Sequence, residues 1–356
     1  MTNFLQLHVL VAYPPSNLNR DDTGRPKSAM MGGVPRLRIS SQALKRAWRT
    51  SSVFADHLQG HLGVRTKRLG AEIRERLAAA GTPDEKALAV PRAVAGVLGK
   101  IKSEKDAAPD EIEQLAFLST EERQAAFDLA ERAVADETIK PAVGDLLQHR
   151  HTAADIAMFG RMLAASPEFN VEAAVQVGHA LTTHRVIAED DYFTAVDDLK
   201  TVDDDRGAGH VGEAEFGSGV FYIYLCVDLD LLAANLGGDR ALAEVAVAAL
   251  IEAAATVAPR GKQASFASRA RASYILAERG SQQPRSLASA FLRPVAGEDL
   301  MGASIAALEK LYVDFDRAYG PGADARCTMN VPGGIGTLKD LITFSAASKA
   351  PVLPAE

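Results

Sequence analysis

The sequence is poor in sulfur ligands and in long apolar runs, and both absences exclude classes of protein. Its 356 residues include two cysteines, Cys226 and Cys327, which lie far apart in the sequence. This spacing fits neither a metal-ligand motif nor a disulfide framework, so we expect two reduced thiols. The most apolar stretch, 242–258, is interrupted by Glu244 and Glu252 and is too short to span a membrane.

Several other signals are also missing. The opening MTNFLQLHVLVAYPP alternates like a strand and lacks a basic leader segment, so we expect no signal peptide and a cytoplasmic location. The sequence GGIGTLKDL at 333–341 lacks the lysine of a P-loop and is weak evidence for a nucleotide site. His179 and His184 have no third ligand at suitable spacing, so hydrogen-bonded strand histidines are the favoured interpretation. We therefore predict no metal and no cofactor.

Positive charge gathers in one stretch of a chain whose formal net charge is −7. Residues 17–49 hold eight lysines and arginines but only two acidic residues, Asp21 and Asp22. A local site for a polyanion is therefore possible inside an acidic protein.

Alternation within this basic stretch predicts a strand over 36–40, the sequence RLRIS. A period of two places Arg36, Arg38 and Ser40 on one face and Leu37 and Ile39 on the other. We expect the face that carries the arginines to be wet and basic.

A helix is predicted directly after this strand, with Ser40 and Ser41 as its N-terminal cap. One stripe of the helix holds Gln42, Lys45, Arg46 and Arg49, opposite Leu44, Ala47, Trp48 and Ala55. Free backbone N–H groups at a helix N-terminus and basic side chains along its face suit a run of phosphates. An ordinary solvated face carries the same residues, and Gly32-Gly33 fits either a close backbone approach or a plain turn.

The rest of the chain divides by pattern. Leu5, Leu7, Val9 and Val11 predict a strand with one buried face, followed by a loop over 13–35. The apolar spacing in residues 61–165 predicts helices, and Ser119 with Glu122 forms a capping-box sequence. Further elements are expected as a strand at 171–186, a strand at 220–232, a helix at 240–257 and a strand at 273–277.

Residues 187–219 have few apolar residues, five glycines and several acidic clusters. Such a segment cannot form a core and should project as an arm or hairpin. Tyr192 and Phe193 are candidates for exposed aromatic residues within it.

The motifs together resemble a known family. NLNRDD at 17–22, the Gly32-Gly33 pair and RLRISSQALKRAWR at 36–49 closely resemble the N-terminal signature of the Cascade backbone subunit (CasC-type) of type I-E CRISPR systems, in the RAMP superfamily. TAADIAMFGRM at 152–162, GHALTTH at 178–184, DYFTAVDDL at 191–199 and the segment 207–224 are also similar.

The resemblance implies an α+β fold with a ferredoxin-like, RRM-type palm formed by residues 1–60 and 166–356. It further implies a β-hairpin thumb at 187–219 and a helical finger insertion at 61–165. The order of the predicted strands and helices is compatible with such a fold.

By the same resemblance the protein is a non-catalytic, RNA-binding subunit of an antiviral ribonucleoprotein. Its expected partners are the CRISPR guide RNA, target DNA through that guide, other Cascade subunits, and copies of itself stacked head to tail in an open filament. The residues carried over as RNA contacts are Arg20, Lys27, Ser40, Gln42, Lys45, Arg46, Arg49 and Lys262, with Met162 and Phe193 as wedges between bases.

Two other functions stay open. One is a metal-dependent RNase that uses Asp203 to Asp205 with His210, and the other is a structural module that binds no nucleic acid. Two-metal nucleases need carboxylates that converge on two cations, whereas adjacent aspartates on an arm point in different directions. We therefore expect no catalytic residues.

Overall fold

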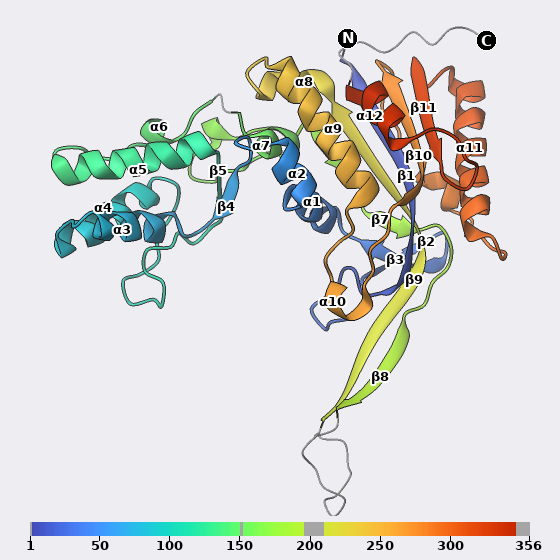
Figure 1. Ribbon diagram of the computed structural model, residues 1–356, viewed down its shortest axis with the longest axis horizontal. Helices are drawn as coiled ribbons and strands as arrows, with labels where there is room; N and C mark the ends of the chain where they lie inside the picture. Colours follow the sequence, from blue (N-terminus) through green and yellow to red (C-terminus); the bar gives the residue numbers. More distant parts are fainter. Residues whose placement is uncertain (1, 150–151, 196–209, 347–356) are drawn as a thin grey trace, which may run out of the picture. The chain divides into compact units, whose positions relative to one another are not determined.

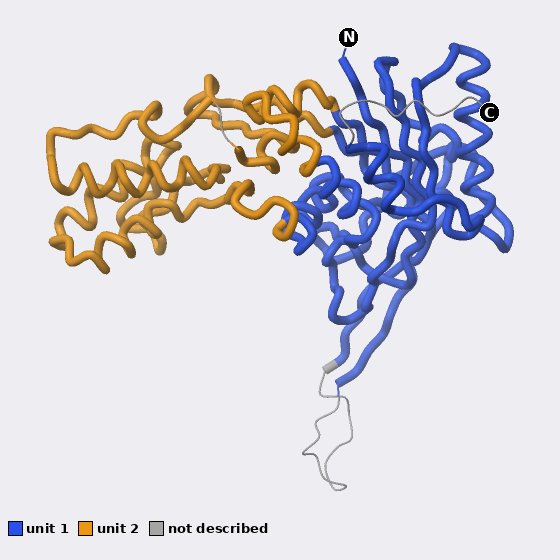
Figure 2. The backbone as a smooth tube through the Cα atoms, turned by 45° about the horizontal axis from the view of Figure 1, so that its top comes forward, with its two compact units in different colours: residues 1–54, 176–227, 247–356 blue, residues 55–175, 228–246 orange. Residues whose placement is uncertain are grey.

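The computed structural model describes residues 2–149, 152–195 and 210–346 and has a mixed α+β fold (Figure 1). The chain divides into two compact units (Figure 2). Unit 1 comprises residues 1–54, 176–227 and 247–356, and unit 2 comprises residues 55–175 and 228–246.

The described strands of unit 1 belong to a nine-stranded sheet with the order β11-β10-β1-β9-β7-β3-β2, in which β6 and β8 also pair with β9. Its strands are β1 (Phe4–Ser16), β2 (Ser28–Met31), β3 (Val34–Ile39), β6 (Val175–Val177), β7 (Ala180–Thr182), β8 (Glu189–Ala195), β9 (His210–Asp228), β10 (Ala272–Gly280) and β11 (Ala325–Asn330). The helices are α1 (Ser41–Arg49), α2 (Ser52–His57), α9 (Arg240–Thr256), α10 (Gln263–Phe266), α11 (Leu300–Tyr319) and α12 (Leu338–Ala346), with a 3-10 turn η2 (Ala288–Phe291). Helices α2 and α9 each continue into unit 2.

Strand β1 is buried on both faces, so the prediction of one buried face is wrong. Leu5, Leu7 and Val9 are buried as expected, and Gln6 and His8 on the opposite face are buried as well. Further along that face, Leu10 packs in a hydrophobic cluster with residues of η2 and α11. Burial of the polar pair is possible because both side chains are hydrogen-bonded.

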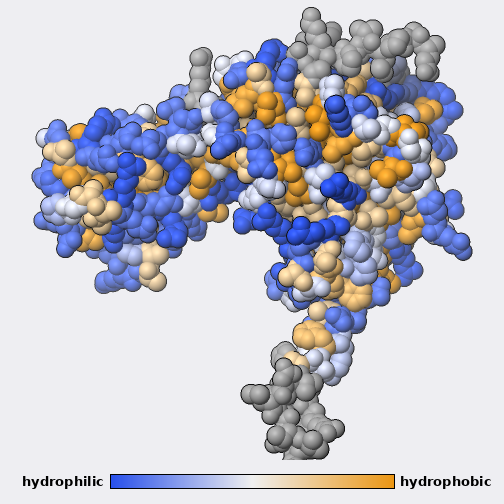
Figure 3. Space-filling model, viewed as in Figure 1, coloured by the Kyte–Doolittle hydropathy of each residue, from blue (hydrophilic) through white to orange (hydrophobic). Residues whose placement is uncertain are grey.

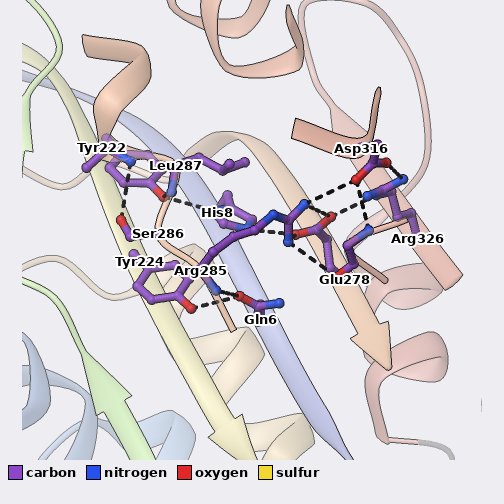
Figure 4. Close-up of polar contacts among 12 residues, drawn as sticks. Gln6, His8, Tyr222, Tyr224, Glu278, Arg285, Ser286, Leu287, Asp316 and Arg326 are labelled. Atoms are coloured by element: carbon purple, nitrogen blue, oxygen red, sulfur yellow. Dashed lines mark hydrogen bonds and ion pairs between the residues drawn. The ribbon is translucent and has the colours of Figure 1, made fainter. Parts of the chain in front are cut away.

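The buried polar residues form a network around Glu278 on β10 (Figure 4). Its carboxylate accepts hydrogen bonds from Arg285 (2.7 and 3.0 Å), Arg326 (2.8 Å) and His8 Nε2 (3.1 Å). Burial by itself would raise the pKa of Glu278, but the hydrogen bonds and charges of these partners outweigh burial and lower that pKa to about 2. Because a carboxylate only accepts, His8 carries its proton on Nε2 and receives the Tyr222 hydroxyl on Nδ1, at 2.8 Å.

The network also fixes the segment that follows β10. The Arg285 backbone N–H donates to Gln6 Oε1 at 2.7 Å, and the Leu287 N–H donates to the Tyr222 hydroxyl at 3.0 Å. A few residues further on, Phe291 and Leu292 contact the β2–β3 hairpin through their carbonyl oxygens. The buried polar residues of the sheet thus set the position of a segment that supports the basic stretch.

The predicted loop over 13–35 is too long, since β1 continues to Ser16 and β2 pairs antiparallel with β3. Gly32 and Gly33 form the two-residue turn between them, with φ angles of 60° and 77°. Two successive positive φ angles suit a tight hairpin whose twist matches its strands. The plain-turn interpretation of the glycine pair holds, and Gly32 also lies directly against the Leu292 carbonyl.

Unit 2 is largely helical, and the predicted insertion over 61–165 falls inside it. It contains β4 (Val64–Thr66), α3 (Leu69–Ala79), α4 (Asp84–Gly96), β5 (Ala116–Leu118), α5 (Thr120–Ala135), α6 (Val143–Leu146), α7 (Ala154–Phe159), η1 (Pro167–Phe169) and α8 (Leu229–Asn235). The capping box at Ser119 and Glu122 is present. Unit 2 also includes residues 228–246, a segment that the sequence had assigned to the palm. Within unit 2, the Asn235 side chain of this segment donates to the carbonyls of Ala157 (3.0 Å) and Glu172 (2.9 Å).

Candidate nucleic-acid interface

Most backbone donors at the N-terminal end of α1 already have partners inside the protein. The Ser40 hydroxyl caps the helix and accepts the Ala43 N–H at 3.2 Å, as predicted. The Ser40 N–H donates to Asn19 Oδ1 at 2.8 Å, and the Ser41 N–H donates to His179 Nδ1 at 3.0 Å. Within the described part of the chain, the Gln42 N–H is the first-turn donor that has no acceptor. This helix end therefore offers a ligand one backbone donor, fewer than the sequence suggested.

The polar stripe of α1 lies where it was predicted. Leu44, Ala47 and Trp48 are buried, whereas Gln42 and Arg46 are exposed. Lys45 and Arg49 are half-buried. The arginines stand in the last turn, where cations favour the negative end of the helix dipole, so part of their role is to stabilise the helix itself.

Arg36 is not on a wet face, so the expectation of a wet, basic face that carries both strand arginines is wrong. Its side chain is fully buried and donates to the carbonyls of Thr182 (2.9 Å) and Phe291 (2.8 Å). Burial lowers the pKa of Arg36. The 3-10 turn η2 covers this face of β3, so only Arg38 of the two strand arginines is partly exposed. Arg36 is a structural brace between β3, β7 and η2.

The loop before β2 is shaped by its own side chains. Asn17 donates to the carbonyls of Gly24 (3.0 Å) and Glu215 (2.9 Å), and Arg25 pairs with the Glu215 carboxylate at 2.8 Å. These contacts tie the loop to β9 at the base of the hairpin. The predicted contact Arg20 is exposed on this loop, and the predicted contact Lys27 is half-buried.

A second loop, residues 258–271, contains the short helix α10 and packs against the loop at 17–27. Gly261 lies so close to the carbonyls of Asn17 and Leu18 that a Cβ atom would overlap them. The predicted contact Lys262 follows with φ at 41°, an unusual angle for a residue other than glycine. Backbone strain of this kind is concentrated at functional sites. A cavity of about 480 Å³ lies between the loops, lined by Leu18, Asn19, Arg20, Asp21, Asp22, Gly24 and Gly261.

The predicted arm is a β-hairpin in its described part, with residues of β8 paired antiparallel to β9 from Glu189↔Phe216 to Ala195↔His210. Phe193 is 44% exposed, and its ring lies over the cross-strand Gly212. Tyr192 and Val211 are also exposed, and apolar surface is visible on this stem (Figure 3). Asp203 to Asp205 lie outside the described residues.

Met162 lies in unit 2 and is 80% exposed, so it is not a core residue. Its neighbours Arg161 and Leu163 are both buried. Arg161 exchanges backbone hydrogen bonds with Val171 at 3.0 and 2.9 Å, and its guanidinium donates to Glu122 at 2.6 Å. Met162 is thus an exposed apolar side chain between two buried residues, and its role as a wedge stays a prediction.

The two histidines are hydrogen-bonded to the backbone, as the sequence favoured. The predicted strand at 171–186 is two short strands, β6 and β7, and His179 lies between them. His184 accepts the Val220 N–H on Nε2 at 3.1 Å. Among the residues that the structure describes, no group of three or more His, Cys, Asp or Glu residues is arranged to hold a metal ion. The same residues include no helix that is long and apolar enough to cross a membrane.

The predicted RNA contacts other than Met162 therefore lie in unit 1, on α1, on the two loops and on the hairpin. A family profile described as CT1975-like protein matches residues 5–343. The chain belongs to the CT1975-like protein family. The resemblance to the CRISPR-associated Cascade backbone subunit is confirmed, whereas the type I-E assignment stays a prediction.

Solved structures, like the family profile, match this chain over nearly its whole length. A chain of a "CRISPR RNA-guided surveillance complex, pre-nicking" is 31% identical to this CT1975-like protein with a TM-score of 0.85, over 96% of this chain and 99% of that one. A chain of a second "CRISPR RNA-guided surveillance complex" is 27% identical with a TM-score of 0.73, over the same shares. A comparison with curated proteins gives no match.

Sequence reasoning missed three side chains that shape the candidate interface. Asn17 and Asn19 hold the loop and the start of α1, and His179 accepts a backbone donor of that helix. The two asparagines stand inside the NLNRDD motif, which was the available signal. His179 was assigned only a strand hydrogen bond, because the pairing that brings it to α1 is not visible in a sequence.

Proposed function

We propose that this CT1975-like protein is a non-catalytic, CRISPR RNA-binding backbone subunit of a type I-E Cascade surveillance complex. The observation that carries the proposal is the similarity along nearly the whole chain to subunits of RNA-guided surveillance complexes. The basic α1 and the loops at 17–27 and 258–271 are the elements proposed to hold the RNA.

The residue types of this interface favour contacts to the RNA backbone. Arg20, Lys27, Lys45, Arg46 and Arg49 are cations that suit phosphates, and the Gln42 N–H adds a neutral donor. Contacts of this kind position a strand without reading its sequence. A guide held in this way keeps its base edges available to pair with target DNA.

Exposed apolar residues complete the proposal. Phe193 and Met162 are each proposed to insert between successive bases, because both are exposed and stand on well-supported backbone. The hairpin is proposed to reach a neighbouring copy, so that subunits stack head to tail along the guide with other Cascade subunits at the ends. The palm is proposed to be of the ferredoxin-like, RRM type.

The decisive experiment is to purify the protein from its host and to sequence the nucleic acid that accompanies it. We expect a discrete small RNA that contains CRISPR repeat sequence and is protected from added ribonuclease at regular intervals. A protein that carries no RNA, or a broad mixture of cellular RNA, would contradict the proposal. A variant with Lys45→Ala and Arg49→Ala, purified in parallel, should carry less of the same RNA.

The proposal includes the absence of nuclease activity. Pure protein incubated with labelled single-stranded RNA and Mg²⁺ or Mn²⁺ should leave the RNA intact. Cation-dependent cleavage that Asp204→Ala abolishes would instead establish the metal-dependent RNase.

A further inference from the structure

His179 is brought to the start of α1 by strand pairing. Strand β3 pairs with β7 in the register Arg38↔Leu181 and Ile39↔Ala180. One step further, His179 stands beside the first residues of α1, and its Nδ1 atom accepts the Ser41 N–H at 3.0 Å. Unlike the fully buried His8, this ring is exposed to solvent.

The hydrogen bond determines the tautomer of the ring. A backbone N–H can only donate, so His179 Nδ1 carries no proton and the neutral ring is protonated on Nε2. Within the described residues, the Nε2–H has no acceptor. His179 therefore presents an unused donor at the solvent edge of the same helix end where the Gln42 N–H is unused.

The surroundings of the ring are cationic. Arg38 on β3 and Lys27 before β2 are close enough to lower the pKa of His179, in addition to the larger effect of partial burial. Lys27 is itself one of the predicted RNA contacts, and Arg38 lies on the strand that leads into α1. A protonated ring would be repelled by these cations and would lose the Ser41 hydrogen bond, so the neutral ring is the form favoured in the folded protein.

We infer that neutral His179 is a further RNA-binding residue, which donates its Nε2–H to a phosphate oxygen of the RNA at the N-terminal end of α1. This inference rests on the proposed function. The Gln42 N–H and the His179 Nε2–H provide two neutral donors at one helix end, and Lys27 and Arg38 provide the charge. A phosphate at this position would be contacted by Lys27 just before β2, Arg38 on β3, Gln42 on α1 and His179 just before β7.

Two conservative variants distinguish a contact between His179 and RNA from a purely structural role of His179. In His179→Asn the amide oxygen can take the place of Nδ1 and accept the Ser41 N–H, but the Nε2 donor is lost. In His179→Gln the amide N–H₂ can take the place of the Nε2 donor, but the acceptor for Ser41 is lost. The measurements are the affinity for a short single-stranded RNA and the thermal unfolding midpoint.

If His179 donates to RNA, His179→Asn should bind RNA about fivefold more weakly per site with an unchanged unfolding midpoint, as expected for one lost hydrogen bond. His179→Gln should keep most of the affinity. The opposite order, with full binding by His179→Asn and a lower midpoint for His179→Gln, would overturn the inference and leave a purely structural role.

The pH dependence gives an independent readout. Because the proposed donor is the neutral ring, the ratio of parent to His179→Asn affinity should stay constant from pH 7 to pH 9. A ratio that falls across this range would show that His179 binds as a cation, which contradicts the inference. Parent protein that binds no RNA would reject the proposed function itself, an outcome distinct from equal binding by parent and His179→Asn.

Discussion

Gly32 packs against the carbonyl group of Leu292 so closely that a methyl group on residue 32 would overlap the carbonyl oxygen. This contact joins the tip of the β2–β3 hairpin to the segment after η2. Its neighbour in the same turn, Gly33, has open space around the position of a Cβ atom. The two glycines therefore form a matched pair, in which both have positive φ and only one has a steric neighbour.

Gly32→Ala should lower the free energy of unfolding by about 3 kcal/mol or more, since it combines the cost of a positive φ with a backbone overlap. Gly33→Ala should cost only about 1 kcal/mol, from the φ angle alone. Urea unfolding of the two variants measures the difference. Equal losses would show that the hairpin tip does not rest on Leu292.

The basic stripe of α1 should control the salt dependence of RNA binding. Changing Lys45 and Arg49 to Ala should flatten the slope of log K against log salt by roughly 1.4, because each phosphate neutralised on a single strand contributes about 0.7. The affinity should fall similarly for two unrelated RNAs. Salt titrations of parent and double variant make this measurement.

A control pair for this experiment stands on α11. Lys310 and Arg317 are exposed and both pair with Asp314. Changing this pair to Ala removes the same charge from a helix that is outside the proposed RNA site, so the slope should stay unchanged. If the α1 double variant kept the slope of the parent, the stripe would be an ordinary solvated face rather than a phosphate-binding surface.

Glu278 should make stability sensitive to acid. Its pKa in the folded protein is about 2, below the ordinary value of 4.5, so the unfolded chain binds more protons between these values. The stabilisation, about 3 kcal/mol, is therefore fully present above pH 4.5 and is lost as the pH falls toward 2. Unfolding free energies measured by denaturant titration at several pH values test this dependence.

Glu278→Gln should lower stability at neutral pH by about 3 to 5 kcal/mol, because Arg285 and Arg326 would lose the buried carboxylate between them. Below pH 4.5 the variant should show a weaker pH dependence than the parent. Asp314→Asn, which removes a half-buried surface carboxylate with two basic partners, should cost far less than Glu278→Gln. A Glu278→Gln protein with parental stability would contradict the role assigned to the network.

The hairpin should be needed for assembly on RNA. Replacing residues 190–213 by a short Gly-Ser linker removes Tyr192 and Phe193 but keeps Glu215, which holds the loop at 17–27. We expect parental unfolding behaviour, binding of one subunit to a short RNA, and loss of ordered arrays on long RNA seen by electron microscopy. Arrays that match those of the parent would show that the hairpin is not the thumb.

The sequence by itself determined the local features of this protein. Ser40 caps α1 and the stripe of Gln42, Lys45, Arg46 and Arg49 lies opposite Leu44 and Trp48, because capping and helical periodicity depend only on neighbours a few residues away. The capping box at Ser119 followed for the same reason, whereas the arm or hairpin at 187–219 followed from its small number of apolar residues. The family was also readable, since its motifs are short and contiguous.

Only the tertiary structure decided which of these residues are available to a ligand. Arg36 has the same alternation pattern as Arg38, yet η2 buries Arg36 from more than two hundred residues away along the chain. His8 and Glu278 are brought together by the pairing of β1 with β10, and His179 reaches Ser41 by the pairing of β3 with β7. Burial and hydrogen bonding between distant segments depend on strand order, which local periodicity does not encode.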